Sequence, residues 1–267
     1  MHCITQQSNK QSAFLVKHFL FLDAKNRHDT IEDKFIPDGS MSIVFNFEGN
    51  VNAINNIGCY ELPSFFVVFP NIQHLVIKTF PPLDSMVVVC KASVFTRIFK
   101  LNLIPYTNQP FIDGRKILSE QLWLEMKNNP NNRQKIFEDF IISIYPTKYI
   151  PDDIDLAYEK IIHSKGETLV NELLKQADIN PRSFRRRFLS RTGVNAKALS
   201  RLVRINYLWD CYLKGQKADF QSMVFEGNYY DQAHLIHDFK KIVGEAPSHF
   251  FNKEQANVLF LSGKVVQ

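Results

Sequence analysis

The sequence lacks the features of a secreted or membrane protein. Its 267 residues contain four cysteines, at positions 3, 59, 90 and 211, and none is close to another. This spacing favours neither a Cys-x-x-Cys site nor a disulfide framework. The apolar stretch from Phe14 to Leu22 is interrupted by Lys17 and has no signal-peptide pattern, and no run approaches the ~18 apolar residues of a membrane helix. We therefore expect a cytoplasmic protein that does not contact the membrane.

Catalytic and cofactor motifs are also missing. Metal-dependent barrels of the cupin type need clustered histidines with a carboxylate. The histidines of the first half are isolated and form no His-x-His: His2, His18, His28 and His74. No nucleophile motif is visible. We predict that the protein is not an enzyme and uses no metal or cofactor.

Positive charge is concentrated in one segment. The chain carries 32 Lys and Arg against 27 Asp and Glu, a net charge of +5. Residues 166–215 hold ten of these cations and only four acids, whereas residues 216–253 hold four cations and five acids. Because the position of charge matters more than its sum, the first of these segments is predicted to meet a polyanion.

The first 112 residues have the pattern of short strands. Ile43, Phe45 and Phe47 alternate with Val44 and Asn46 after the turn signal at 37–40, and further strands are expected at 64–69, 74–80 and 85–90. Many short strands separated by turn residues indicate a sandwich or small barrel.

Helical patterns follow the strands. Residues 116–128 and 133–145 predict a helical hairpin (115–146), and 146–151 reads as a linker between two prolines. We predict an α+β protein with a domain at 1–148, an all-α domain at 152–255 and a tail at 256–267. In the second hairpin helix Phe137, Phe140, Ile141 and Ile144 form one apolar stripe. That stripe fits either packing on the hairpin's own sheet or a homodimer interface through 116–145.

Residues 168–193 predict a helix-turn-helix. An amphipathic helix over 168–177 is followed by a tight turn at 178–179. Asn180 is a good N-cap, Pro181 suits the first helical position, and Gly193 can end the second helix, 181–192, in the left-handed conformation.

The second of these helices has an aromatic face and an arginine-rich face. Phe184 and Phe188 are spaced to be buried together, while Arg182, Arg185 and Arg186 share another face beside Ser183. An arginine can pair two donors with guanine O6 and N7, which discriminates bases by roughly 1–3 kcal/mol. Arg187 and Arg191 are better placed for phosphates. The alternative, a merely solvated face, is disfavoured because these cations repel one another without a polyanion.

These residues are part of a wider resemblance. Residues from about 155 to 253 resemble the DNA-binding domain of the AraC/XylS family of bacterial transcription regulators, in which one long helix joins two helix-turn-helix units. The joining helix corresponds to 195–213, with Arg204 at a position where the family usually has arginine. The second unit corresponds to 219–244, with Phe220, Met223 and Val224 on its first helix. Its recognition helix begins at Asp231 and resembles the family's Asp-x-Ser-His-Phe.

The resemblance implies roles for individual residues. Gln232, Ala233, Ile236 and His237 would face DNA from the second unit. Structural roles would fall to Phe184, Phe188, Gly193, Arg204, Asp231, His234, Phe239, Gly244 and Pro247. The sequence departs from the family pattern at Asn228-Tyr229, which replaces a Gly-Phe turn, and at Ala196, which replaces a proline. Because the second recognition helix has no arginine, we expect the first unit to supply most of the base readout.

In this family an N-terminal cupin-like domain commonly senses a small molecule or mediates dimerisation. Phenylalanines 45, 47, 65, 66 and 69 could line an apolar pocket for such an effector, although we favour a core role for them. The expected partners are double-stranded DNA, a small-molecule effector and, for an activator, RNA polymerase. The prediction is a sequence-specific transcription activator. The alternative is a ligand-binding or protein-interaction module whose helix-turn-helix domain no longer binds DNA.

Overall fold

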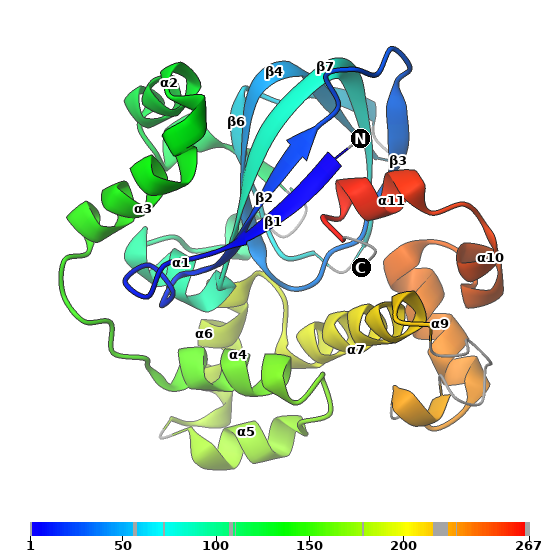
Figure 1. Ribbon diagram of the computed structural model, residues 1–267. Helices are drawn as coiled ribbons and strands as arrows, with labels where there is room; N and C mark the ends of the chain where they lie inside the picture. Colours follow the sequence, from blue (N-terminus) through cyan, green and yellow to red (C-terminus); the bar gives the residue numbers. More distant parts are fainter. Residues whose placement is uncertain are drawn as a thin grey trace.

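A computed structural model describes residues 2–55, 58–71, 73–106, 109, 111–177, 179–215, 224–227 and 229–264 (Figure 1). The predicted turn residue Asp178, the helix residues Phe220 and Met223, and Asn228 lie outside this described part. The described strands all lie within the first 113 residues and helices dominate the remainder, as an α+β architecture requires. Within the described residues no helix is both long and apolar enough to span a membrane.

The strands form one strongly curled, antiparallel sheet. Its order is β1-β2-β7-β4-β6-β8, with β3 paired to β7 and β5 paired to β4. The strands are β1 (His2–Gln7), β2 (Val16–Asp23), β3 (Ile31–Phe35), β4 (Met41–Asn55), β5 (Gly58–Glu61), β6 (Phe65–Val68), β7 (Leu75–Cys90) and β8 (Phe111–Asp113).

Strand β7 is longer than the sequence indicated. We predicted separate strands at 74–80 and 85–90, but β7 continues through Pro81-Pro82. Proline is tolerated in a sheet at irregular positions, and the pairing of β4 with β7 shifts register here, between Glu48 and Asn50. Gly49 makes this possible, since its φ is +86° and a Cβ there would lie 2.3 Å from the Pro82 carbonyl oxygen.

Both faces of the sheet are buried, and the side chains alternate between them. On one face Phe19, Ile43, Phe45 and Val88 join a core shared with helices. The other face bears an apolar cluster that includes Leu20, Leu22, Phe66, Val87 and Val89. Because the side-chain period of a strand is two residues, the long strands β2, β4 and β7 each supply both layers.

Helices cover the first of these faces. They are α1 (Ala92–Ile98), α2 (Glu120–Asn128) and α3 (Arg133–Ile144). The hairpin α2–α3 packs on its own sheet: Phe137 and Ile141 are fully buried, and the Phe137 ring lies 6.1 Å from Phe19 and 5.9 Å from Phe45. Of the predicted apolar stripe, only Ile144 is exposed.

The C-terminal half is helical and lies along one side of the sheet (Figure 1). Its helices are α4 (Asp153–His163), α5 (Val170–Gln176), α6 (Pro181–Thr192), α7 (Ala196–Leu213), α9 (Gln232–Val243), α10 (Pro247–Asn252) and α11 (Ala256–Leu261). Helix α7 joins the two helix pairs, and α11 returns to the sheet and packs against β3.

The burial of Phe137 leads to a stability prediction. Replacing a buried phenylalanine by alanine removes apolar contacts and leaves a cavity, so Phe137→Ala should lower the free energy of unfolding by roughly 3–5 kcal/mol. Ile144→Ala, on the exposed part of the same helix, should change it by less than about 0.5 kcal/mol. Urea unfolding at low protein concentration compares the two. A larger loss for Ile144→Ala would mean that the outer face of α3 carries the main contact.

Candidate DNA-binding face and barrel cavity

Helix α6 has the ends that the sequence predicts. The Asn180 side chain accepts a hydrogen bond from the Ser183 backbone N–H at 2.9 Å, and Pro181 occupies the first helical position. At the other end Gly193 adopts the left-handed conformation, with φ at +74°. Helix α6 is therefore defined by local signals at both ends.

The two faces of α6 separate as expected. Phe184 and Phe188 are 1% exposed and pack with their ring centroids 5.6 Å apart. Arg182, Arg185 and Arg186 are exposed, and no ion pair holds them within the described residues. Ser183 is half-buried beside them. This arrangement leaves three guanidinium groups free for a partner on a helix fixed by its aromatic side.

Arg191, the last arginine of α6, does not share the exposed face of Arg182, Arg185 and Arg186. Arg191 donates to Asp152 at 2.9 Å, to Asp155 at 2.7 Å and to the Ser93 carbonyl at 2.7 Å. Asp155 is 2% exposed and also accepts from Arg97 and Tyr149. We predicted a phosphate contact for Arg191, whereas the structure commits it to this internal network.

Arg187 has a looser position. It approaches Asp152 at 3.5 Å and keeps 41% of its side chain exposed. A pair this long and this exposed contributes little to stability. Arg187 is therefore free to exchange Asp152 for a phosphate, which Arg191 is not.

The second recognition helix, α9, also has well-defined ends. The Asp231 side chain caps it by accepting from the His234 N–H at 2.7 Å, and Gly244 ends it with φ at +83°. Gln232, Ala233 and His237 are exposed, and Ile236 is half-buried. The first turns of α9 carry no cation other than histidine, in contrast to α6.

A buried carboxylate lies behind this surface. Asp238 is 1% exposed and faces Arg201 at 3.4 Å, His234 at 3.6 Å and His237 at 3.4 Å. The His234 ring also packs edge-on against Tyr229. These contacts connect the His234 ring to Asp238 and Tyr229 within the second unit.

Other residues with predicted structural roles pack in the core of the second unit. The Arg204 guanidinium lies over the Tyr229 ring at 4.7 Å. Phe239 is 1% exposed and contacts Phe250, and Pro247 is buried at the start of α10.

Both recognition helices have their C-terminal ends against the barrel. A Cβ on Gly193 would lie 3.3 Å from the Pro70 carbonyl oxygen, and one on Gly244 would lie 2.2 Å from the His74 ring. The backbone N–H of His74 also donates a hydrogen bond to the Ile242 carbonyl at 2.9 Å. Pro70 and His74 belong to the same connection, between β6 and β7. At 12 residues and about 1.5 Å per residue, each helix extends roughly 18 Å from this contact to its N-terminal end.

The joining helix α7 rests on the turn at 37–40. Asn206 donates from its amide nitrogen to the Pro37 carbonyl at 2.8 Å, and the Tyr158 hydroxyl donates to the Gly39 carbonyl at 3.1 Å. Gly39 has φ at +89°, and a Cβ there would lie 2.3 Å from a methyl group of Leu199. The turn that the sequence predicted is thus a docking site for the C-terminal half.

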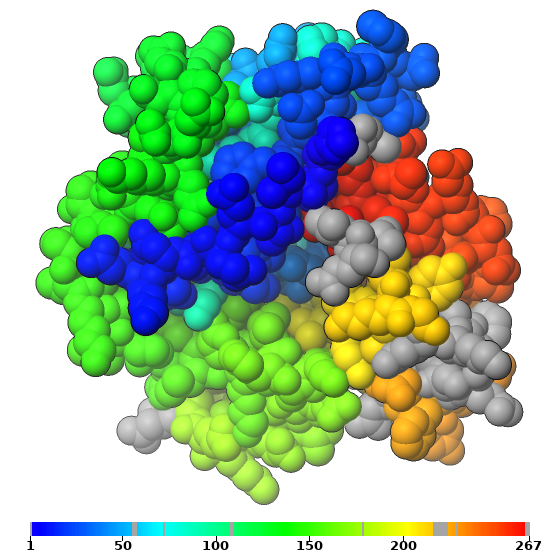
Figure 2. Space-filling view, viewed as in Figure 1, coloured from blue at the N-terminus to red at the C-terminus, as the bar shows by residue number. Residues whose placement is uncertain are grey.

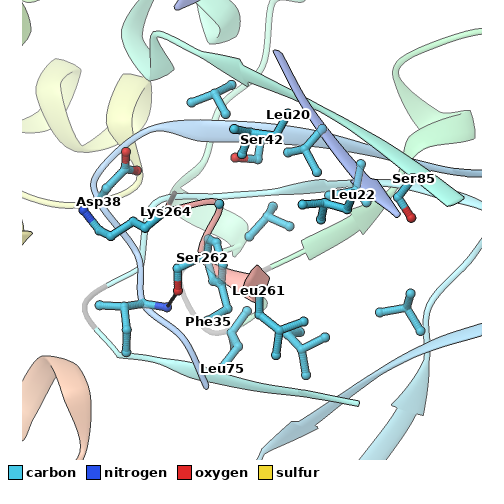
Figure 3. Close-up of a pocket in the computed structure, with 18 of the residues that line it drawn as sticks. Leu20, Leu22, Phe35, Asp38, Ser42, Leu75, Ser85, Leu261, Ser262 and Lys264 are labelled. Carbon is cyan, nitrogen blue, oxygen red and sulfur yellow. Dashed lines mark hydrogen bonds between the residues drawn. The ribbon is translucent and has the colours of Figure 1, made fainter. Parts of the chain in front are cut away.

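The second face of the sheet borders a cavity of about 290 Å³. Its walls are mostly aliphatic, with side chains such as Leu20, Leu22, Val44 and Val87. The C-terminal segment closes one side, where Ser262 accepts a hydrogen bond from the Ile36 N–H at 3.0 Å (Figure 3). In the space-filling view this segment, in red, lies directly against the strands (Figure 2).

Most of the phenylalanines proposed for a pocket lie outside it. Of these five, Phe66 alone lines the cavity, whereas Phe45, Phe47, Phe65 and Phe69 belong to the core on the opposite face. The core role that we favoured therefore holds for these four. The cavity residues were instead present in the alternating pattern, as Val44 and Asn46 between the phenylalanines.

Polar groups lie at the two ends of the cavity. Ser85 donates to Asn46 at 2.7 Å at one end, and Asp38 and Lys264 lie together at the other (Figure 3). Burial opposes the ionisation of Asp38, but Lys17 and two hydrogen bonds from Ser40 outweigh it and hold the pKa of Asp38 below its usual value. Burial, together with Lys17, also lowers the pKa of His18, so this ring favours its neutral form.

The C-terminal helices match a known family. Residues 173–253 match a family described as a helix-turn-helix domain. This segment is an AraC-type helix-turn-helix domain. The match supports a DNA-binding transcription regulator and runs from within α5 to the end of α10, with the joining helix α7 between them.

Solved structures with this arrangement include ToxT from Vibrio cholerae, at 16% identity and a TM-score of 0.47, covering 87% of this chain and 97% of that one. A second ToxT structure, bound to an unsaturated fatty acid, is 15% identical with a TM-score of 0.44. That match covers 92% of this chain and 96% of the ToxT chain. The AraC-like transcriptional activator CuxR is 10% identical, with a TM-score of 0.27 and 79% of each chain covered. These identities limit the likeness to the fold. No curated protein matches the chain.

The Arg191 network leads to a prediction on the AraC-type domain. Arg191→Met leaves two carboxylates without their main partner, one of them buried, and should lower the free energy of unfolding by about 3–5 kcal/mol. Arg187→Met, one turn earlier and more exposed, should cost less than about 1 kcal/mol. Thermal or urea unfolding of both variants tests this. Equal losses would contradict the assignment of Arg191 to the internal network.

The contact between the barrel and the second unit is expected to weaken in acid. Burial opposes ionisation of Glu245, but hydrogen bonds from Lys253, Lys34 and His249 lower its pKa to about 2. A depressed folded-state pKa stabilises the protein above the unfolded pKa, near 4.5, and this contribution is lost as the pH falls toward 2. Glu245→Gln should therefore destabilise the protein at pH 7, and its deficit should shrink between about pH 5 and 3. Chemical unfolding across this range measures it, and a deficit that does not vary with pH would contradict the ion-pair explanation.

Proposed function

We propose that this protein is a sequence-specific DNA-binding transcription regulator in which the first helix-turn-helix supplies most of the base readout. The observation that supports it best is the face of α6, where Arg182, Arg185 and Arg186 are exposed and free of ion pairs within the described residues. The N-terminal half of α6 extends away from the barrel, as a helix must to enter a major groove. Neighbouring Ser183 and Arg187 are suited to phosphate contacts.

The second unit has a weaker role in this proposal. Gln232 can pair with adenine, Ala233 and Ile236 can contact a thymine methyl group, and His237 can reach a phosphate or base edge. Without arginine, α9 adds fewer charge-dependent contacts than α6. We therefore propose an asymmetric site with a strongly bound first half and a weakly bound second half.

The barrel cavity is the proposed effector site. It is concave, lined mostly by apolar side chains and has a few polar groups at its ends, which is the usual character of a small-molecule site. Its lining comes from the sheet, from α7 and from the C-terminal segment. A bound molecule would therefore contact the part of the chain that positions the two helix-turn-helix units.

We further propose that the protein is a cytoplasmic activator that contacts RNA polymerase, as is usual for the AraC/XylS family. A homodimer through 116–145 would use the outer face of the hairpin, where Leu124 and Ile144 are each 41% exposed, because the inner face is occupied by the sheet. These roles need neither catalysis nor a cofactor.

DNA binding is tested with fragments of the source genome by fluorescence anisotropy at two salt concentrations. Arg185→Ala and Arg186→Ala should each weaken selective binding by about 5- to 150-fold, the effect of losing one bidentate base contact. Lys10→Ala, which removes an exposed cation from the turn between β1 and β2, is the matched control and should leave binding unchanged. Salt should weaken wild-type binding with a log–log slope of about −0.9 per phosphate contact.

The same measurement separates the two candidate functions. Selective, salt-dependent binding that is lost in the α6 variants supports the regulator. If the folded protein binds no fragment at low salt, with and without candidate effectors, the helix-turn-helix domain has another use, such as holding a protein partner. The acidic balance of residues 216–253 is the feature that favours this second candidate.

A further inference from the structure

A second hollow lies within the C-terminal half, in the crevice between α7 and α9. These two helices pack against each other (Figure 1), and the space between them has a volume of about 150 Å³. The beginning of α7 lines one side with Asn195, Lys197 and Arg201, and α9 lines the other side with Asp238 and Lys241. None of these residues lines the barrel cavity, so the crevice is a separate site.

The crevice contains a buried carboxylate without a hydrogen-bond donor. Asp238 is 1% exposed, yet neither of its carboxylate oxygens accepts a hydrogen bond from the described residues. Its charged neighbours approach these oxygens without bonding: Arg201 Nε to 3.4 Å, His234 Nε2 to 3.6 Å and His237 Nδ1 to 3.4 Å. Arg201 Nε is itself buried and donates to no acceptor among the described residues. Since unpaired buried polar groups are costly, a group that accepts from Arg201 and donates to Asp238 is favoured here.

The crevice also has an excess of positive charge. Lys197 and Lys241 are exposed and form no ion pair within the described residues. Together with Arg201 they place three cations against the single carboxylate of Asp238. The beginning of α7, a helix of 18 residues, adds the positive end of its dipole. The crevice therefore favours an anion, provided that this anion offers Asp238 a hydrogen atom.

Inorganic phosphate meets both requirements. It is an anion at neutral pH, and it keeps at least one proton there. Its P–OH group can donate to Asp238 while its other oxygens accept from Arg201 and the lysines. Sulfate has the same shape but no proton, and a phosphodiester of the DNA backbone has none either. Either of these would place an oxygen lone pair against a buried carboxylate, which is unfavourable.

We propose that the crevice between α7 and α9 binds inorganic phosphate, with Asp238 accepting its hydrogen atom and Arg201, Lys197 and Lys241 balancing its charge. Asp238 selects a protonated oxyanion, whereas the three cations attract anions in general. The site goes beyond the proposed function and does not depend on it.

The position of the site gives phosphate a contact with both helices. Arg201 belongs to the joining helix α7, whereas Asp238 lies one turn after His234 on the second recognition helix. A bound phosphate bridges the two and holds α9 in one orientation on α7. In the proposed regulator this makes the weakly bound second half of the DNA site sensitive to phosphate, a consequence that rests on the proposed function.

Three anions test the selection at pH 8: inorganic phosphate, sulfate and dimethyl phosphate. Binding to the full-length protein is measured by isothermal titration calorimetry at constant ionic strength. Phosphate should bind at least about tenfold more tightly than the other two, which lack the hydrogen atom that Asp238 accepts. Sulfate binding as tight as phosphate, or no binding of phosphate at millimolar concentration, overturns the proposal. Equally tight binding of dimethyl phosphate would assign the crevice to the DNA backbone and overturns it as well.

Three variants locate the site. Asp238→Asn replaces the acceptor by an amide that can donate, and should bring sulfate binding to within about threefold of phosphate binding. Lys241→Gln should weaken phosphate and sulfate alike by about three- to tenfold. Lys240→Gln, which changes the neighbouring exposed lysine outside the crevice, is the matched control and should affect neither anion.

Unfolding curves show whether the variants are folded, and if Asp238→Asn is not, the anion comparison and Lys241→Gln still decide. A preference for phosphate that survives Asp238→Asn, or phosphate binding that Lys241→Gln leaves unchanged, would mean that phosphate binds elsewhere, and the inference fails. The calorimetry needs no DNA. A protein that binds phosphate but no DNA fragment would lose the proposed regulator and keep this site, whereas one that binds DNA but does not distinguish phosphate from sulfate would keep the regulator and lose the site.

Discussion

Strands β2, β4 and β7 carry apolar side chains on both of their faces, so water must be kept from both. The helices α1, α2 and α3 cover one face. The other face curls around a cavity that the sheet alone does not close, and residues from α7 and the C-terminal segment complete its wall. The arrangement of the whole chain follows from this requirement, because the DNA-binding half also covers part of the barrel.

Several features could be predicted from the sequence because they depend on neighbouring residues. The limits of α6 follow from Asn180, Pro181 and Gly193, and those of α9 from Asp231 and Gly244. Capping and left-handed glycine are local effects, and they need no knowledge of the tertiary structure.

Other features depend on which distant segments meet. The alternation in β4 shows that two sets of side chains face opposite ways, but not which set faces helices and which faces a cavity. Because of their size the phenylalanines were the candidates for the pocket lining, yet the smaller Val44 and Ser42 line the cavity. The network of Arg191 with Asp152 and Asp155 was equally hidden, since the charge pattern of α6 alone does not reveal a buried acidic partner some 36 to 39 residues earlier in the chain.

The two recognition helices share a reference point in the β6–β7 connection. Neither Gly193 nor Gly244 has a side chain to separate its helix from Pro70 or His74. The flanking strands β6 and β7 contribute Phe66 and Leu75 to the cavity wall. In the proposed regulator, a molecule bound in the cavity would therefore contact the two strands that flank this reference point, and would act on both recognition helices through one short segment of the barrel.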